Sequence, residues 1–401
     1  MKDVYSLLQR LTTIPQPMTT RALPWLLVLG GLWPFAAALA EVAQPNTRAS
    51  VGTYTLEEAI AQGVVDINYN PWTKRSIAPM TSHLAELNPG LINRIGFLYG
   101  GPSTFFLNAM RDVVAAVRQI LPRALFGGGF NESVYNDYRQ TLDCGGDGGS
   151  QTFDAGEVSS AKNPGSNAHF VDIAKPAAQD FYICIGRMLI DRGVTYLHFE
   201  APVLVLNAAS SAAGGVAGYR RVRGELIRYA LQKHLTLYFS GDPSLAAQMT
   251  LDGVYMPSRL YHVTVPDLLR YQNRIEEPHV GVGYTYALSS KMIDDTVRET
   301  PPGMHVFFYI DNWDESQDDL RRLMELDAEN RRRLLVLSAT AAHAGGAYFI
   351  PPLTHCEGCV QPGHVGDACE ILKDGVSEYD AYACGDFAAI GLALAREGQR
   401  R

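Results

Sequence analysis

Short β-rich runs alternate with amphipathic helical stretches from Leu91 almost to the end of the chain. Eight such runs, each of five to nine residues, are bounded by Gly, Pro, Asn or Asp, which is typical of buried strands. The runs are Asn93–Tyr99, Ala124–Phe130, Val194–Pro202, Leu235–Ser240, Gly253–Pro257, Val280–Ala287, His305–Trp313 and Ala347–Pro352. Because parallel strands require long crossover connections, eight strand–helix units predict a (β/α)8 barrel over residues 91–401.

The competing architecture is a doubly wound open sheet, which also alternates strands and helices. Such sheets carry a Gly-x-Gly-x-x-Gly turn after the first strand when they bind dinucleotides, and none stands there. The glycine run Gly127–Gly129 lies within or at the end of the second strand, where the lack of side chains lets neighbours fill a barrel interior. The sequence therefore favours the barrel, with long loops at residues 143–168 after strand two and 353–383 after strand eight.

Residues 1–40 have the pattern of an export signal. Basic residues precede an apolar run that ends in Ala38-Leu39-Ala40, the small-residue pattern of a cleavage site. An uncleaved membrane anchor is the alternative, because about 19 apolar residues are just enough to span a bilayer. Cleavage predicts a periplasmic or extracellular protein, which contacts the membrane only if this segment is retained.

Residues 41–90 are expected to form an N-terminal extension of the barrel domain. Within it, Val64–Asn70 is predicted as an extra strand, positioned to cap the barrel floor. The formal net charge of −8 provides no basic field for a phosphate backbone, so a nucleic-acid partner is not expected. These patterns imply no organic cofactor, and they do not fix the oligomeric state.

Glu200 is the first candidate catalytic residue. It ends the third predicted strand, and the strand period of two places Tyr196, His198 and Glu200 on one side. Leu197 and Phe199 then face the other side. A carboxylate that continues a row with a histidine indicates the polar wall of a barrel mouth, where barrel enzymes hold their reactive groups. The structural alternative is a strand-end glutamate that forms a salt bridge or caps the next segment.

Asp311 is the second candidate catalytic residue, because Phe307, Tyr309 and Asp311 share one side of the seventh predicted strand. The neighbouring Asp314 and Glu315 are better explained as negative charge at the start of the next helix. Other strand-end residues are candidates for substrate binding, although a position in the core or in a turn explains several of them equally well. They are His198, Tyr99, Glu132, Asp242, Tyr286, Tyr309 and Trp313.

With carboxylates and aromatic residues at its strand ends, the chain resembles secreted glycoside-hydrolase barrels over about residues 91–396. The resemblance is one of layout. The Asn-Glu pair that one common barrel clan carries after strand four is absent, because Ser240-Gly241-Asp242-Pro243 stands there. A Gly-x-Ser-x-Gly elbow and a His-Glu-x-x-His motif are missing as well.

The resemblance implies hydrolysis of a polysaccharide or oligosaccharide by two carboxylates that flank the glycosidic bond. Glu200 would then be the general acid, and Asp311 the base or nucleophile. The alternative is a non-catalytic glycan-binding barrel that takes part in handling an envelope polysaccharide.

The cysteines allow two interpretations. Cys356, Cys359, His364 and Cys369 have the spacing of a zinc knuckle, which would be a closed structural site. An export signal favours disulfides instead, because disulfides form outside the cytoplasm. Cys184 lies on a predicted amphipathic helix and is expected to be a buried thiol. The six cysteines allow 15 full pairings, so the sequence leaves the pairing open.

Overall fold

The computed structural model describes residues 52–67, 77–96, 101–161, 167–199, 202–241, 258–262, 293–294, 297–298, 305–309, 323, 328–354, 381 and 384–398. The chain divides into the units Met1–Gly52 and Thr53–Arg401. The predicted signal segment lies outside the described residues, so the fold below is that of the second unit.

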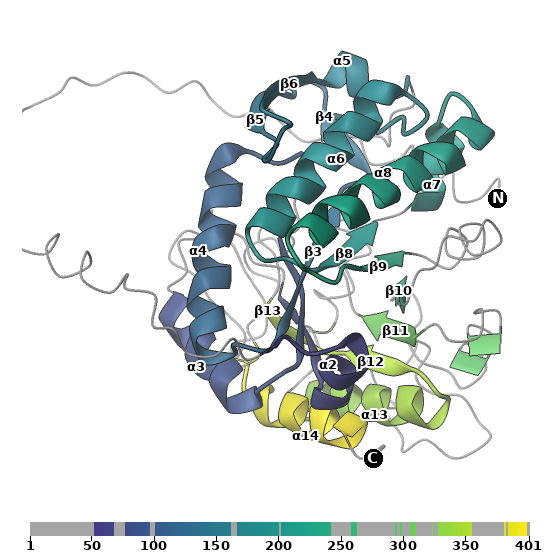
Figure 1. Ribbon diagram of the computed structural model, residues 1–401. Helices are drawn as coiled ribbons and strands as arrows, with labels where there is room; N and C mark the ends of the chain where they lie inside the picture. The colour runs from purple at the N-terminus through teal and green to yellow at the C-terminus, as the bar shows by residue number, and fades with distance from the viewer. Residues whose placement is uncertain are drawn as a thin grey trace, which may run out of the picture. The chain divides into compact units, whose positions relative to one another are not determined.

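A single parallel sheet forms the centre of this unit (Figure 1). In sequence order it contains β1 (Val64–Ile67), β2 (Leu91–Gly96), β3 (Leu125–Phe130), β8 (Tyr196–Phe199), β9 (Tyr238–Gly241), β10 (Ser258–His262), β11 (His305–Tyr309), β12 (Tyr348–Ile350) and β13 (Pro352–Thr354). From β1 to β12, each strand pairs in parallel with the next sheet strand along the chain. This is the order of a barrel wound without reversal.

The two edges of this sheet meet at Pro351. β12 pairs with β11 at one edge and β13 pairs with β1 at the other, and only Pro351 separates β12 from β13. A proline has no N–H to donate, which accounts for the break between the two strands. Its carbonyl oxygen still accepts a hydrogen bond from Asp66 N at 3.0 Å. β12 and β13 therefore act as one eighth strand that closes the ring, as the predicted (β/α)8 barrel requires.

The barrel starts earlier in the chain than residue 91. Val64–Ile67, expected as an extra strand in an extension, is the first strand of the ring and pairs with β2 and β13. Of the predicted runs, Gly253–Pro257 and Val280–Ala287 lie outside the described residues. β10 begins at Ser258 and pairs directly with β11. Eight strands are predicted and eight form the ring, but two of them, β1 and β10, are segments outside the eight predicted runs.

The helices lie outside the strands in Figure 1. They include α3 (Ile77–Leu87), α4 (Thr104–Ile120), α6 (Pro176–Asp191), α7 (Pro202–Ala208), α8 (Ala212–Gln232), α13 (Ala328–Ala344) and α14 (Phe387–Gly398). In α4 the apolar positions Phe106, Met110 and Val117 are buried against the barrel. The Ser103 side chain caps this helix by accepting a hydrogen bond from Phe106 N at 3.2 Å. The amphipathic pattern and the cap together explain where the helix starts and which face it buries.

The long connection after β3 has its own secondary structure. β4 (Ser133–Tyr135) pairs with β7 (Ala168–Phe170), β5 (Arg139–Asp143) pairs with β6 (Ser150–Asp154), and α5 (Ala155–Val158) follows β6. The long connection after this strand is as the sequence predicts, but residues 150–158 within the predicted loop 143–168 form β6 and α5. Glycines with positive φ, at 67° for Gly145 and 58° for Gly149, allow the tight turn that joins β5 to β6.

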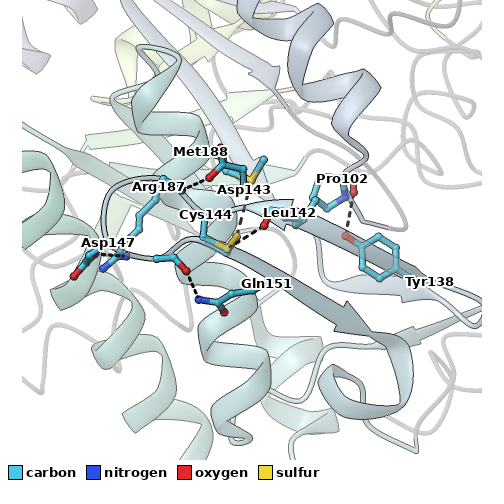
Figure 2. Close-up of a disulfide and its surroundings, with 12 residues drawn as sticks. Pro102, Tyr138, Leu142, Asp143, Cys144, Asp147, Gln151, Arg187 and Met188 are labelled. Atoms are coloured by element: carbon cyan, nitrogen blue, oxygen red, sulfur yellow. Dashed lines mark hydrogen bonds and ion pairs between the residues drawn. A yellow bond between two sulfur atoms is a disulfide. The ribbon is translucent and has the colours of Figure 1, made fainter.

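A disulfide joins this hairpin to the barrel (Figure 2). It links Cys144, in the turn between β5 and β6, to Cys184 in the middle of α6. Cys184 is thus not the buried thiol that the sequence predicts. Beside the disulfide, Arg187 Nη1 lies 3.1 Å from Asp147 Oδ1 and so connects the same helix to the same turn.

The buried apolar residues form two clusters, which lie on the two faces of the ring. The outer cluster packs under the helices and includes Leu197 and Phe308. The inner cluster lies inside the ring and contains Val64, Leu91, Leu125, Tyr196, Phe307, Tyr309 and Ile350. Its remaining members, Leu56, Ala59 and Ile60, come from α2 (Leu56–Gln62). This helix, rather than a strand, closes the barrel floor.

Candidate active site

Side chains at the carboxyl-terminal ends of β8 and β11 follow the alternation that the sequence predicts. On β8, Tyr196 belongs to the inner cluster, while Leu197 and Phe199 belong to the outer one. On β11, Phe307 and Tyr309 belong to the inner cluster. His198 and Tyr309 are therefore the last described inward positions of their strands, and each precedes by two residues a carboxylate of the sequence, Glu200 or Asp311.

His198 is buried and is hydrogen-bonded across the sheet. Its Nδ1 lies 3.0 Å from Oγ of Ser240, which occupies the matching position on β9. Only 3% of His198 and none of Ser240 is exposed. The strand period predicts His198 as a site residue, whereas no sequence signal identifies Ser240, which begins the segment Ser240-Gly241-Asp242-Pro243.

A second polar cluster lies inside the ring on β1 and β2. Asp66 accepts hydrogen bonds from Nδ2 of Asn93 at 3.1 Å and from Nε of Arg94 at 2.9 Å, and a further bond from Arg94 Nη2 completes a two-pronged ion pair. The guanidinium carbon of Arg94 lies 4.7 Å from the ring centre of Tyr309 on β11. All four side chains are buried. The cluster therefore connects two strands on one side of the barrel with β11.

An irregularity in β2 directs two consecutive side chains into the barrel. Ile92 pairs with Phe126 and Gly96 pairs with Gly128, so β2 has two more residues than β3 over this stretch. Within it, Arg94 has a left-handed backbone with a φ of 53°. Such a φ is uncommon for a residue with a side chain and is often found at functional sites. The bulge is the reason that both Asn93 and Arg94 contact Asp66.

Gly127 on β3 leaves room for this cluster. A Cβ atom at this position would lie 3.0 Å from Cα of Asn93 and 3.1 Å from its Oδ1. The prediction that the glycine run allows close packing inside a barrel is therefore confirmed at Gly127. Asn93 Oδ1 is buried and has no hydrogen-bond partner, which leaves a polar acceptor atom inside the ring.

Most of the other predicted site residues lie outside the part of the chain that the structure describes. Glu200, Asp311, Tyr99, Asp242, Tyr286 and Trp313 lie outside the described residues, as do Cys356, Cys359, His364 and Cys369 of the suggested zinc knuckle. Glu132 is described and is partly buried just after β3. Burial raises the pKa of the neighbouring Tyr182 hydroxyl well above its usual range, and the negative charge of Glu132 adds to this effect.

A small cavity of about 20 Å³ lies beside the end of β3, between α4 and α6. Its walls are mainly apolar, from side chains such as Phe106, Leu107 and Phe181. Asn131 and Ser133 also line it, and their buried side-chain polar atoms have no hydrogen-bond partner. A space of this size holds a single water-sized group and is too small for a sugar ring.

In the described part of the chain, no group of three or more His, Cys, Asp or Glu side chains is arranged to hold a metal ion. No helix in the same residues is both long and apolar enough to cross a membrane.

No protein-family model and no curated protein sequence matches this chain. Among solved structures it is similar to the glycoside hydrolase domain of PelA from Pseudomonas aeruginosa, with 12% identity and a TM-score of 0.40 over 72% of this chain and 93% of that one. It is also similar to an alpha-amylase from H. orenii, with 10% identity and a TM-score of 0.43 over 72% of this chain and 67% of that one.

A third similar structure is the Nostoc punctiforme debranching enzyme, with 12% identity and a TM-score of 0.44 over 81% of this chain and 70% of that one. Glycoside hydrolases are thus among the structural neighbours. The chemistry of this chain is derived from its own residues.

Proposed function

We propose that the chain is a glycoside hydrolase that acts on a polysaccharide or oligosaccharide through Glu200 and Asp311. The observation that carries the proposal is the inward orientation of His198 and Tyr309. Residues two apart in an extended strand face the same side. Because β8 and β11 run in parallel, their carboxyl-terminal ends also lie at the same end of the barrel. This supports a location of both carboxylates at the barrel mouth.

Two carboxylic groups of this kind are sufficient for glycosidic hydrolysis. One donates a proton to the leaving oxygen, and the other activates a water molecule or attacks the sugar carbon directly. We assign the proton donor to Glu200 and the second role to Asp311. Tyr99, Tyr286, Tyr309 and Trp313 would provide aromatic surfaces for sugar rings, and Glu132, Asp242 and His198 would provide hydrogen bonds to hydroxyl groups.

The same proposal includes export from the cytoplasm. The apolar run before Ala40 has the pattern of a signal segment. The disulfide between Cys144 and Cys184 supports an oxidising compartment, since such bonds are rare in the cytosol. A carbohydrate partner fits this location, because polysaccharides are abundant in cell envelopes and outside cells.

The first prediction concerns the two carboxylates. Glu200→Gln and Asp311→Asn each lower the rate of glycan hydrolysis by at least about 100-fold, because each removes a group that transfers a proton or attacks carbon. The measurement is the release of reducing ends from a panel of polysaccharides and oligosaccharides. Each variant is compared with Asp112→Asn, which changes an exposed carboxylate on α4.

The control is expected to keep full activity and to match both variants in melting temperature. Glycan hydrolysis that survives both substitutions contradicts the assignment of Glu200 and Asp311. Binding of a glycan by the unaltered protein without any hydrolysis supports the non-catalytic alternative instead.

A further inference from the structure

The six residues between β5 and β6, Cys144–Gly149, contain four glycines, and we call them the glycine turn. Cys144 begins the turn and is bonded to Cys184 on α6. The next residue, Gly145, packs on Asp191, since a Cβ atom at Gly145 would lie 2.4 Å from Asp191 Oδ2. Cys184 and Asp191 are seven residues apart, which is about two helical turns, so they share one face of α6. The glycine turn therefore lies along this face.

Tyr229 on α8 also contacts the glycine turn. Its hydroxyl group donates to Asp191 and lies 2.9 Å from both carboxylate oxygens. A Cβ atom at Gly145 would lie 2.9 Å from the Tyr229 hydroxyl oxygen, and one at Gly146 would lie 3.0 Å from Tyr229 Cε2. These distances are shorter than ordinary van der Waals contacts, so only glycines allow the turn to approach this closely. Tyr229 and Asp191 thus form a surface on which the turn docks, which we call the seat.

Two basic side chains fix the seat. Lys233, which caps α8, has its Nζ 2.6 Å from Asp191 Oδ1 and 4.9 Å from the centre of the Tyr229 ring. The guanidinium carbon of Arg187 lies 5.0 Å from the same ring centre. Cations at this distance are attracted to the face of an aromatic ring. None of these contacts involves a cysteine, so the seat does not require the disulfide.

The disulfide is buried beside the glycine turn (Figure 2). Only 1% of Cys144 and 1% of Cys184 is exposed. Thiol–disulfide exchange requires an attacking thiolate to reach a sulfur atom, so its rate depends on access. In the folded chain, an external thiol reaches this bond only when the turn lifts from α6.

We propose that the seat formed by Tyr229 and Asp191 controls the redox exchange of the disulfide between Cys144 and Cys184. In the reduced chain, the docked turn keeps Cys144 beside Cys184, so the bond closes on a contact that already exists. In the oxidised chain, the same docking keeps external thiols away from the sulfur atoms. This device is independent of the proposed glycan hydrolysis.

The closing reaction is an exchange with an external disulfide, for which oxidised dithiothreitol is the probe. One protein thiolate attacks a sulfur atom of the probe, which forms a mixed disulfide and frees one probe thiolate. The second protein thiolate then attacks the protein sulfur of the mixed disulfide and frees the second probe thiolate. The protein dithiol loses two electrons and two protons, and the probe gains both as its dithiol. Docking favours the second step, because only this step requires the two cysteines to meet.

The test compares two alanine substitutions that place a similar strain on the turn but differ in their contact with the seat. Gly145 and Gly149 both have a positive φ, of 67° and 58°. An added Cβ atom at Gly145 meets Asp191 and Tyr229, whereas one at Gly149 meets nothing within 4 Å. Gly149→Ala is therefore the matched control for Gly145→Ala. Tyr229→Leu removes part of the seat itself, and Leu231→Ala, at an exposed position of the same helix, is its control.

Each full-length protein is equilibrated in mixtures of reduced and oxidised dithiothreitol. The Cys144–Cys184 peptide is quantified by mass spectrometry after alkylation, because Cys384 also takes part in a disulfide. We expect the equilibrium constant for closing this disulfide to fall at least about 10-fold in Gly145→Ala and Tyr229→Leu, and to stay within about threefold in both controls.

The rate of reduction by dithiothreitol under native conditions tests the shielding. It is expected to rise at least about 10-fold in Gly145→Ala but not in Gly149→Ala. Leu56→Ala, in the inner cluster, lowers global stability without touching the seat, and it should leave this rate within about threefold. An equal acceleration in Leu56→Ala would show that reduction follows global unfolding, and it would overturn the shielding.

If Tyr229→Leu does not fold, the two glycine variants decide the question. Equal equilibrium constants and equal reduction rates in Gly145→Ala and Gly149→Ala overturn the proposal, because the two variants differ in their contact with the seat.

Discussion

Ser133 and Ser240 are equally buried serines that differ in whether the hydroxyl group has a partner. Neither residue is exposed. Ser240 Oγ lies 3.0 Å from Nδ1 of His198, whereas Ser133 Oγ lines the small cavity beside β3 without a hydrogen-bond partner. A buried polar group costs free energy unless a hydrogen bond compensates for its loss of water. The two serines are therefore expected to have different effects on stability.

The prediction is that Ser240→Ala lowers the free energy of unfolding by about 1 kcal/mol, because it removes the buried hydrogen bond between His198 Nδ1 and Ser240 Oγ. Ser133→Ala is expected to change stability by less than about 0.5 kcal/mol or to raise it, because the hydroxyl that it removes has no partner to lose. Urea unfolding of the two variants beside the unaltered protein measures the difference. Equal losses in both variants would contradict the prediction.

At the same scale, the sequence predicts the candidate site only where the strands are regular. Alternation is a local property of extended backbone, so it correctly predicts the inward side of Tyr196 and Tyr309. It does not predict that Asn93 and Arg94 both contact Asp66, because the register shift in β2 breaks the alternation. Polar residues inside otherwise apolar strands are the signal that could have identified this cluster.

The connection after β3 is the element that departs most from its prediction. Its glycines and serines are typical of a loop, yet Arg139–Asp143 and Ser150–Asp154 pair as an antiparallel hairpin. The amino-acid composition does not show that several of the glycines lie in one short turn between two paired strands. Nor does spacing show that Cys144 pairs with Cys184, because the two are brought together only when the hairpin packs on α6.

The disulfide should matter more for stability than the ion pair beside it. We predict that Cys144→Ala/Cys184→Ala lowers the free energy of unfolding by about 2–4 kcal/mol, because a cross-link restricts the unfolded chain. Asp147→Asn, which removes the neighbouring contact with Arg187, is expected to change it by less than about 1 kcal/mol. The side chain of Asp147 is 91% exposed, so water screens its charge.

Guanidinium chloride unfolding of both variants, with and without reductant, provides the measurement. Reductant should lower the stability of the unaltered protein by more than it lowers that of the double cysteine variant, because Cys384 also takes part in a disulfide. If the oxidised protein and the double cysteine variant have the same free energy of unfolding, the disulfide does not stabilise the protein, contrary to the prediction.

For the whole molecule, the number of strands was easier to predict than the point at which the ring closes. Each strand–helix unit has a local pattern, but closure depends on the pairing of β1 with β13, some 290 residues apart. Short apolar runs do not show which of them pair in one sheet. For this reason the sequence pattern places Val64–Ile67 outside the barrel, although it is the first strand of the ring.

The helix α2 is expected to contribute to the stability of the barrel but not to the proposed catalysis. It closes the end at which the strands begin. Leu56 N donates a hydrogen bond to the hydroxyl of Tyr238, the first residue of β9, at 3.3 Å, and Tyr54 N donates to Arg123 O at 2.9 Å just before β3. The reactive groups of a barrel lie at the opposite end of the strands. A change in α2 should therefore affect folding without affecting the site.

The prediction is that Leu56→Ala lowers the free energy of unfolding by about 2–5 kcal/mol, because it leaves a cavity in the inner cluster. The kcat for a hydrolysed glycan stays within about twofold at temperatures where the variant is folded, since catalysis depends on groups that touch the substrate. Glu57→Gln, on an exposed position of the same helix, is the control and should alter neither quantity. A loss of kcat in folded Leu56→Ala would contradict this prediction. It would mean that the packing of α2 affects the active site at the opposite end of the strands.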